Sequence, residues 1–228
     1  MSDKRKLFIH IQKSAGMTIR HSPVLHDKII IAERGIHKPG HADAVKKVMD
    51  ANGDHHGWEH ARLRDIQTSI TDNHTSFAII RNPWDRVVSR YFFAKKVIEV
   101  EKKAPTSYAD VSSFEAFLEE RFIWGGKDYY WHRAIRNWYP AREHVINHNN
   151  RVSCDILTFE NLNEELCKYF SIPNMSRARN VTGLNSGTYM DMYTPATIQI
   201  IADWYKDDID TWGFDFDTPA TKNTYYLD

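Results

Sequence analysis

Short apolar runs alternate with segments of helical period along most of the chain. The runs of strand length cover residues 7–11, 28–32, 75–81 and 152–157. Helical spacing or helix-start signals mark residues 16–22, 42–51, 61–66, 114–122, 160–170 and 194–212, and a further helix opens at Pro83. This alternation favours an α/β fold, in which helices connect the strands of a parallel sheet. Because no repeat, low-complexity segment or long linker is present, we expect one domain over residues 1–228.

The first apolar run leads directly into a loop of small and cationic residues. Lys13, Ser14, Ala15 and Gly16 follow the strand, and a helix is expected to start near Gly16. A strand, a tight loop and a helix start bring successive backbone N–H groups and a lysine to one spot, which suits an anion. An ordinary turn with one surface lysine is the alternative. The pattern G-x-x-x-x-G-K-[ST] is absent, which disfavours a nucleoside triphosphatase but not an anion site.

A second strand ends in another polar segment with helix-start signals. Arg81 lies at the carboxyl end of the run 75–81, where open α/β sheets bind ligands. Pro83 suits the first helical turn, and Asp85 suits the positive end of the helix. Ser89 lies about two helical turns after Arg81. The two side chains therefore share a ligand only if the helix runs alongside that ligand.

The histidines between these two segments are candidates for proton transfer. We expect His60 at the start of a helix over residues 61–66, where the helix dipole keeps an imidazole neutral and able to accept a proton. The alternative is a solvated loop histidine, since the chain has 12 histidines. The pair His55 and His56 has no carboxylate or cysteine at a convincing ligand spacing, so we expect no metal.

Two further segments offer polar side chains. Residues 129–139 mix aromatic and basic residues, which suits either an acceptor pocket or a helix that buries its aromatic side chains. The loop-like residues 171–188 contain three possible anion contacts, Arg177, Arg179 and Asn180.

Composition limits the partners and the compartment. Lys+Arg and Asp+Glu are equal at 30 each, so no global charge favours nucleic acid or a membrane surface, and any anion site is local. The two cysteines, Cys154 and Cys167, form no C-x-x-C pair and fit a reducing compartment. No stretch approaches the ~18 consecutive apolar residues of a membrane span. We therefore expect a soluble, cytoplasmic protein.

Three motifs, in this order, resemble those of the PAPS-dependent sulfotransferases, especially the carbohydrate branch. The family loop P-K-T-G-G-T-S is similar to residues 12–18. The family motif R-N-P-[YW]-D-R-x-x-S is matched without departure by residues 81–89, and F-E-N-L by residues 159–162. Further similarity covers residues 189–193 and 213–216. The resemblance therefore spans nearly the whole chain.

The resemblance implies a P-loop-NTPase-like central parallel sheet flanked by helices, and 3′-phosphoadenosine 5′-phosphosulfate (PAPS) as the donor. The contacts that it implies for the 5′-phosphosulfate are Lys13, Ser14, Ala15, Gly16, Met17 and Thr18. Those for the 3′-phosphate are Arg81 and Ser89. No nucleic acid, membrane or metal is implied as a partner.

The implied reaction moves a sulfuryl group in line to an acceptor hydroxyl, expected on a saccharide, with Lys13 stabilising the leaving oxygen. His60 looks most like the family's catalytic base, with His56 and His55 next and Glu59 weaker. Gln12 and Met17 depart from the family loop, but backbone donation survives both changes. Without the anchor and lumenal disulfides of Golgi members, the chain resembles soluble microbial or viral members. A nucleotide or small-molecule kinase, or a non-catalytic nucleotide-binding protein, are the alternatives.

Overall fold

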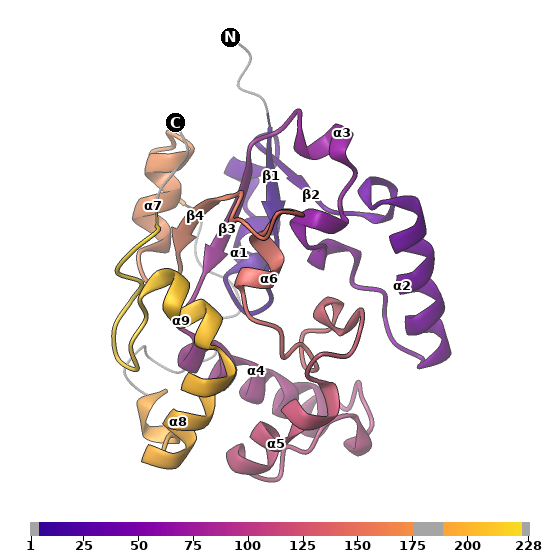
Figure 1. The fold of residues 1–228 in the computed structure, drawn as a ribbon, viewed down its shortest axis with the longest axis vertical. Helices are drawn as coiled ribbons and strands as arrows, with labels where there is room; N and C mark the ends of the chain where they lie inside the picture. Colours follow the sequence, from indigo (N-terminus) through magenta and orange to yellow (C-terminus); the bar gives the residue numbers. More distant parts are fainter. Residues whose placement is uncertain (1–4, 176–188, 225–228) are drawn as a thin grey trace.

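A four-stranded parallel sheet forms the centre of the molecule, in the order β2-β1-β3-β4 (Figure 1). The computed structural model describes residues 5–175 and 189–224, so Arg177, Arg179 and Asn180 lie outside the described residues. The strands are β1 (Lys6–Ile9), β2 (Ile29–Ile31), β3 (Ser76–Ile80) and β4 (Asp155–Thr158). All four lie within or overlap the apolar runs of the sequence, and the α/β prediction is confirmed.

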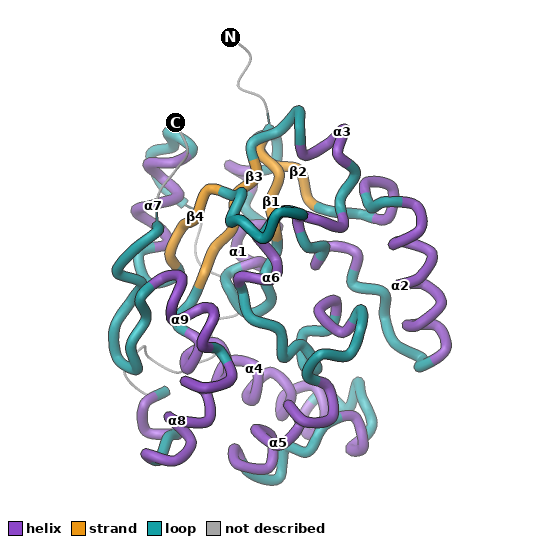
Figure 2. Tube along the Cα trace, viewed as in Figure 1, coloured by secondary structure: helices purple, strands orange, loops and turns teal. Residues whose placement is uncertain are grey.

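Helices connect the strands and lie on both faces of this sheet (Figure 2). They are α1 (Gly16–Arg20), α2 (Pro39–Ala51), α3 (Thr68–Thr71), α4 (Pro83–Lys95), α5 (Phe114–Trp124), α6 (Arg142–Val145), α7 (Leu162–Tyr169), α8 (Pro195–Trp204) and α9 (Lys206–Trp212). The side chains of a strand alternate between the two faces. Leu7 and Ile9 of β1 therefore join the larger core, which includes residues of α4 and α5, while Phe8 joins a smaller core with α1 and α7.

The strand order places a topological switch point between β1 and β3. From β1 the chain crosses to β2 on one side, and from β3 it crosses to β4 on the other side. The loops that follow β1 and β3 thus diverge and leave a crevice at the carboxyl ends of the strands. Ligands of open α/β sheets bind in this position. Both motifs singled out in the sequence, residues 12–18 and 81–89, meet there.

Helix starts follow the local signals of the sequence. Asn82 caps α4 by accepting hydrogen bonds from the backbone N–H groups of Trp84 and Asp85, and Pro83 occupies the first turn. Thr194 caps α8 through a capping box with Thr197. These caps fix the start of α4 beside the crevice and the start of α8, which packs against α4; there Trp84 Nε1 donates to the Ile198 carbonyl at 3.1 Å.

Three helical predictions are wrong in extent. Residues 61–66 form no α-helix; they contain the 3₁₀ turn Leu63–Asp65, after an earlier turn, Trp58–His60, because so short a segment gains few helical hydrogen bonds. Residues 129–139 hold only the 3₁₀ turn Tyr130–His132. The expected helix 194–212 is interrupted at Tyr205, whose buried hydroxyl accepts a hydrogen bond from Arg90 at 3.1 Å.

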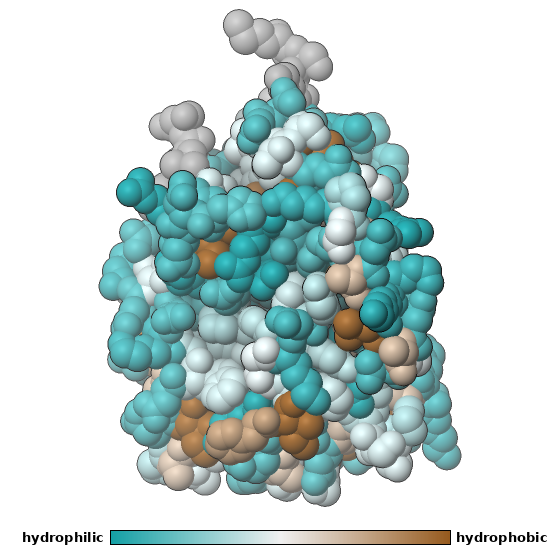
Figure 3. Space-filling view, turned by 45° about the vertical axis from the view of Figure 1, so that its right-hand side comes forward, coloured by the Kyte–Doolittle hydropathy of each residue, from teal (hydrophilic) through white to brown (hydrophobic). Residues whose placement is uncertain are grey.

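The surface seen in Figure 3 is mostly hydrophilic; its broadest apolar group lies near the lower edge, and smaller ones lie higher up. Large apolar side chains that are well exposed include Val100 and two residues of α5, Phe122 and Ile123. Among the described helices, none has the length and apolar character that crossing a lipid bilayer requires.

Candidate active site

A cavity of about 1470 Å³ opens at the carboxyl ends of β1 and β3. Most of the predicted site residues line it: Lys13, Ala15, Gly16, Met17, Thr18, His60, Arg81 and Ser89. Residues from far apart in the sequence therefore share one hollow. Ser14 is the exception, since it is buried away from the cavity wall and its N–H donates to the carbonyl of Ile11 at 3.3 Å.

The loop after β1 presents backbone donors to this cavity. Lys13 and Ala15 both adopt left-handed backbone conformations, with φ of 63° and 61°. The N–H groups of Ala15, Gly16 and Met17 donate to no acceptor within residues 5–175 and 189–224. The N–H of Thr18 is already used, because it donates to the carbonyl of Ala15 at 2.9 Å. Three consecutive free amides in such a loop form a concave site for an anion.

Gly16 is required by the close approach of a histidine ring. A Cβ at this position would overlap the imidazole of His10, which is buried directly behind the loop. The His10 ring stacks on Phe8, with ring centroids 5.4 Å apart, and it packs against His60 at 4.2 Å. His10 thus links the amide loop to the candidate base, and the sequence analysis missed this role.

Lys13 places an ammonium group in the cavity without a carboxylate partner among the described residues. Its Nζ lies 4.3 Å from the centroid of the Phe93 ring, a contact that favours a cation. Burial, followed by the nearby charges of Arg81, Lys96 and Arg90, lowers the pKa of Lys13 to about 8. The group is therefore mostly protonated at pH 7 and available to an anionic ligand.

Arg81 is held rigidly between the two motifs. Its Nε and Nη2 each donate to the Asp85 carboxylate at 2.7 Å, and its Nη1 donates to the carbonyl of Lys13 at 2.8 Å. The guanidinium also lies over the Phe159 ring, with Cζ 4.0 Å from its centroid. A guanidinium has five N–H groups, so two of them remain for a ligand. Ser89 lines the same cavity from the next turns of α4.

His60 has a defined tautomer and a low basicity. Its Nδ1 lies 3.1 Å from the carbonyl oxygen of His10, so Nδ1 carries the proton and Nε2 carries the lone pair. Burial lowers the pKa of His60 to about 4, although Glu59 and the His10 carbonyl partly oppose this shift. The ring is neutral because it is buried at the end of a 3₁₀ turn, and not because of the helix dipole that the sequence suggested.

The other candidate bases lie in different surroundings. Glu59 lines the cavity but accepts a hydrogen bond from Arg20 at 2.8 Å as part of an ion pair. His55 also lines the cavity. His56 is not part of the cavity wall; its Nε2 lies 2.8 Å from Asp50 on the outer side of α2. Among these residues, only His60 combines burial with a free ring nitrogen at the cavity.

The segment 129–139 divides its aromatic and basic residues between core and cavity. Tyr130, Trp131 and Trp138 are buried in the core, whereas Arg133 and Arg136 line the cavity. Both arginines lie within 4 Å of the Asp54 carboxylate. The segment therefore contributes two guanidinium groups to the cavity, which share the one Asp54 carboxylate.

The hydrogen bonds of Gln12 account for glutamine at a position where the family loop has proline. Its side chain is buried, donates to the carbonyl of Trp131 and accepts from Asn137. These bonds tie the loop after β1 to the segment 129–139. A proline at this position would have no side-chain amide for either bond.

A parallel sheet with an amide loop, a lysine and a fixed arginine at its switch point is an α/β arrangement suited to an anionic ligand. The model of the sulfotransferase family matches residues 1–215, and the chain belongs to this family. Membership supports sulfotransfer as its activity. No curated protein and no solved structure matches the chain.

Proposed function

We propose that the protein transfers a sulfuryl group from PAPS to a hydroxyl group of a carbohydrate. The observation that supports this proposal best is the single cavity shared by the amide loop, Lys13, Arg81, Ser89 and His60. PAPS carries anionic groups at its 5′ and 3′ ends, and the cavity has cationic or amide donors at the ends of two adjacent strands. A mononucleotide that carries phosphate at one end only would leave the donors at the end of one of these two strands without a ligand.

In this proposal the loop after β1 holds the 5′-phosphosulfate. The free N–H groups of Ala15, Gly16 and Met17 fit its oxygens, and the Lys13 ammonium adds a full charge. The two remaining N–H groups of Arg81 and the hydroxyl of Ser89 bind the 3′-phosphate. The bonds from Arg81 to Asp85 and to Lys13 fix the guanidinium before any ligand arrives, which lowers the ordering cost of binding.

The donor supplies an activated sulfuryl group, and the residues of the chain position and stabilise the reacting atoms. His60 Nε2 accepts the proton of the acceptor hydroxyl, since Nδ1–H is fixed on the His10 carbonyl. Lys13 neutralises the charge that develops on the leaving oxygen. Both groups have the required protonation state near pH 7, because the pKa of His60 is about 4 and that of Lys13 about 8.

The acceptor side of the cavity favours an anionic saccharide. Arg133, Arg136 and Tyr108 line the cavity, and the two guanidinium groups share a single carboxylate, that of Asp54, so one positive charge is left over. Guanidinium groups bind carboxylate and similar oxyanions through paired hydrogen bonds, so these arginines would favour a glycan that carries carboxylate or sulfate groups. We also propose a cytoplasmic location, which the free thiols of Cys154 and Cys167 support.

Calorimetric titration with adenosine 3′,5′-bisphosphate, AMP and ATP with Mg²⁺ tests the donor. We expect the bisphosphate to bind most tightly, because only it engages both anion-binding groups of the cavity. A preference for ATP would instead support a kinase. Transfer of labelled sulfate from PAPS to a panel of neutral and acidic oligosaccharides then tests the reaction. Tight bisphosphate binding without any transfer would indicate a non-catalytic nucleotide-binding protein.

A further inference from the structure

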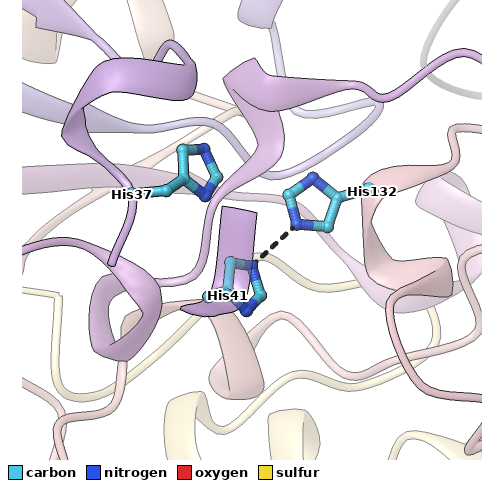
Figure 4. A group of neighbouring side chains, drawn as sticks. All are labelled: His37, His41 and His132. Atoms are coloured by element: carbon cyan, nitrogen blue, oxygen red, sulfur yellow. Dashed lines mark hydrogen bonds between the residues drawn. The ribbon is translucent and has the colours of Figure 1, made fainter. Parts of the chain in front are cut away.

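Three histidines from two distant segments converge beside the turn that carries His60 (Figure 4). His37 precedes α2, His41 lies in its first turns, and His132 belongs to the 3₁₀ turn Tyr130–His132. One ring nitrogen from each histidine lies within 4.8 Å of the corresponding nitrogens of the other two. The rings of His37 and His132 are buried, and only a small part of the His41 ring is exposed.

Hydrogen bonds on the outer side of the cluster fix which nitrogens carry lone pairs. His37 Nε2 lies 2.8 Å from the carbonyl oxygen of Trp58, and His132 Nδ1 lies 2.9 Å from that of Gly57. A carbonyl oxygen only accepts, so both of these nitrogens are protonated. The lone pairs therefore lie on His37 Nδ1 and His132 Nε2. His41 has its Nδ1 3.7 Å from the Asp65 carboxylate, which favours a lone pair on Nε2.

One pair of facing nitrogens has the spacing of two metal ligands. His41 Nε2 and His132 Nε2 are 3.3 Å apart, as the dashed line in Figure 4 marks. Two nitrogens bound tetrahedrally at about 2.0–2.1 Å from zinc are separated by roughly 3.3–3.4 Å. A direct hydrogen bond between the two rings is the alternative explanation of this distance. That bond leaves His37 Nδ1 buried without a partner among the described residues, a cost of about 1–3 kcal/mol.

We propose that His37, His41 and His132 bind a Zn²⁺ ion, through Nδ1 of the first and Nε2 of the other two. Three neutral imidazoles are a donor set that zinc prefers, and a water molecule completes a tetrahedral shell. The carbonyls of Trp58 and Gly57 and the Asp65 carboxylate then form the outer shell that orients such ligands in known zinc sites. Burial lowers the pKa of all three histidines, which keeps them unprotonated at neutral pH.

The position of the cluster indicates a structural role. The two carbonyl acceptors belong to the segment that ends in His60, and a Cβ at Gly57 would overlap the His132 carbonyl. An ion bound there would hold this turn against the start of α2 and the segment 129–133. The sequence analysis expected no metal because it considered only the adjacent pair His55 and His56, whereas this set becomes visible only once residues 37, 41 and 132 are brought together.

Zinc titration of tag-free protein, after chelator treatment and dialysis, tests the site without any activity assay. We expect one Zn²⁺ per chain by calorimetry, and a tetrahedral cobalt absorption spectrum when Co²⁺ is bound instead. No stoichiometric binding to the folded wild-type protein would overturn the proposal. Because this result needs no variant, it does not depend on whether a substituted protein folds.

Variants then identify the ligands. His41→Gln is the first choice because His41 is partly exposed and its replacement disturbs the core least. We expect this change to weaken Zn²⁺ binding by more than the roughly 10–100-fold that removal of an outer-shell partner such as Asp65 (Asp65→Asn) typically causes. His56→Gln is the matched control and retains full affinity. Unchanged affinity in His41→Gln, or a loss in His56→Gln, would contradict the assignment.

Discussion

Arg81 Nη1 donates a hydrogen bond to the backbone carbonyl of Lys13 at 2.8 Å, and so joins two loops that are 68 residues apart in sequence. The same guanidinium forms two further hydrogen bonds with Asp85 at the start of α4. A displacement of the loop after β1 would therefore strain the hydrogen bonds that hold Arg81 at the start of α4. The two proposed anion sites are coupled through this one side chain, which gives Arg81 a role in shaping the loop as well as in binding.

Replacement of Arg81 by alanine should mainly weaken binding of adenosine 3′,5′-bisphosphate. The change removes the proposed 3′-phosphate donors and also frees the Lys13 carbonyl, so we expect at least a tenfold rise in Kd, about 1.4 kcal/mol. Calorimetry measures this directly. Arg34→Ala, which removes an exposed arginine paired with Asp43, is the control and should leave Kd unchanged. A normal Kd with a lower kcat would refute the assigned role.

Lys13→Met should lower kcat by roughly 10²–10³-fold, because the charge opposite the leaving oxygen is lost while the side-chain length is kept. Wild-type kcat/KM should also fall as the pH rises through about 8, where Lys13 in the free enzyme loses its proton. Steady-state kinetics over a pH series measures both effects. Lys46→Met, at an exposed ion pair of α2, is the control. Full turnover by Lys13→Met would remove this residue from the mechanism.

His60→Gln should reduce kcat by roughly 10²–10⁴-fold while the Kd of the bisphosphate stays nearly constant, since the change removes the base but no donor contact. On the acidic side, wild-type kcat/KM should hold until the pH approaches about 4, where His60 becomes protonated. His56→Gln, outside the cavity wall, serves as the control. If His60→Gln kept its activity, His55, which lines the cavity, would be tested next.

The sequence predicted the strands well, and it pointed to the sheet edge at which the two motifs meet, for local reasons. The central strand β3 is an apolar run buried along its whole length, and the helix start at Pro83 depends on nearby residues such as Asn82. The two motifs therefore stood out before their contacts were known. The switch point between β1 and β3 follows from strand order, which no local pattern encodes.

What the sequence missed depends on contacts between distant residues. His10 looked like one polar residue in an apolar strand, yet its ring and its carbonyl define the position and tautomer of His60. Arg81 pairs with the nearby Asp85, but its bond to the Lys13 carbonyl, 68 residues away in sequence, is revealed only by the folded loop. The spacing of His37 and His41 was a usable signal, but His132 lies 91 residues further along.

Gly16→Ala should damage both stability and donor binding. The new methyl group overlaps the His10 ring, and Phe8 and His60 pack against that ring and oppose its displacement. Overpacking of this kind costs about 1–3 kcal/mol. Urea denaturation and calorimetry with the bisphosphate measure the two effects. Gly40→Ala is a matched control, since a Cβ at Gly40 meets nothing within 4 Å. Wild-type stability in Gly16→Ala would show that the loop adapts freely.

Buried histidines should make the folded state sensitive to acid. Burial lowers the pKa of His10 and His144 well below the ordinary value of 6.5, so the folded protein does not take up these protons while the unfolded chain does. Stability is then complete above about pH 6.5 and falls below it, by roughly 1.4 kcal/mol per pH unit for each such histidine. Urea unfolding at about pH 7, 6 and 5, on both sides of the ordinary histidine pKa, measures this slope.

His144→Gln isolates one contribution to that slope. Glutamine retains an acceptor for the Asn137 amide, which lies 3.3 Å from His144 Nε2, but it has no group that titrates in this range. The variant should therefore lose less stability between neutral and acidic pH than the wild type does. His26→Gln, at a side chain that is 84% exposed, should keep the wild-type slope. Equal slopes for His144→Gln and the wild type would mean that His144 gains a proton in the folded protein, which would contradict the burial argument on which the neutral state of His60 also depends.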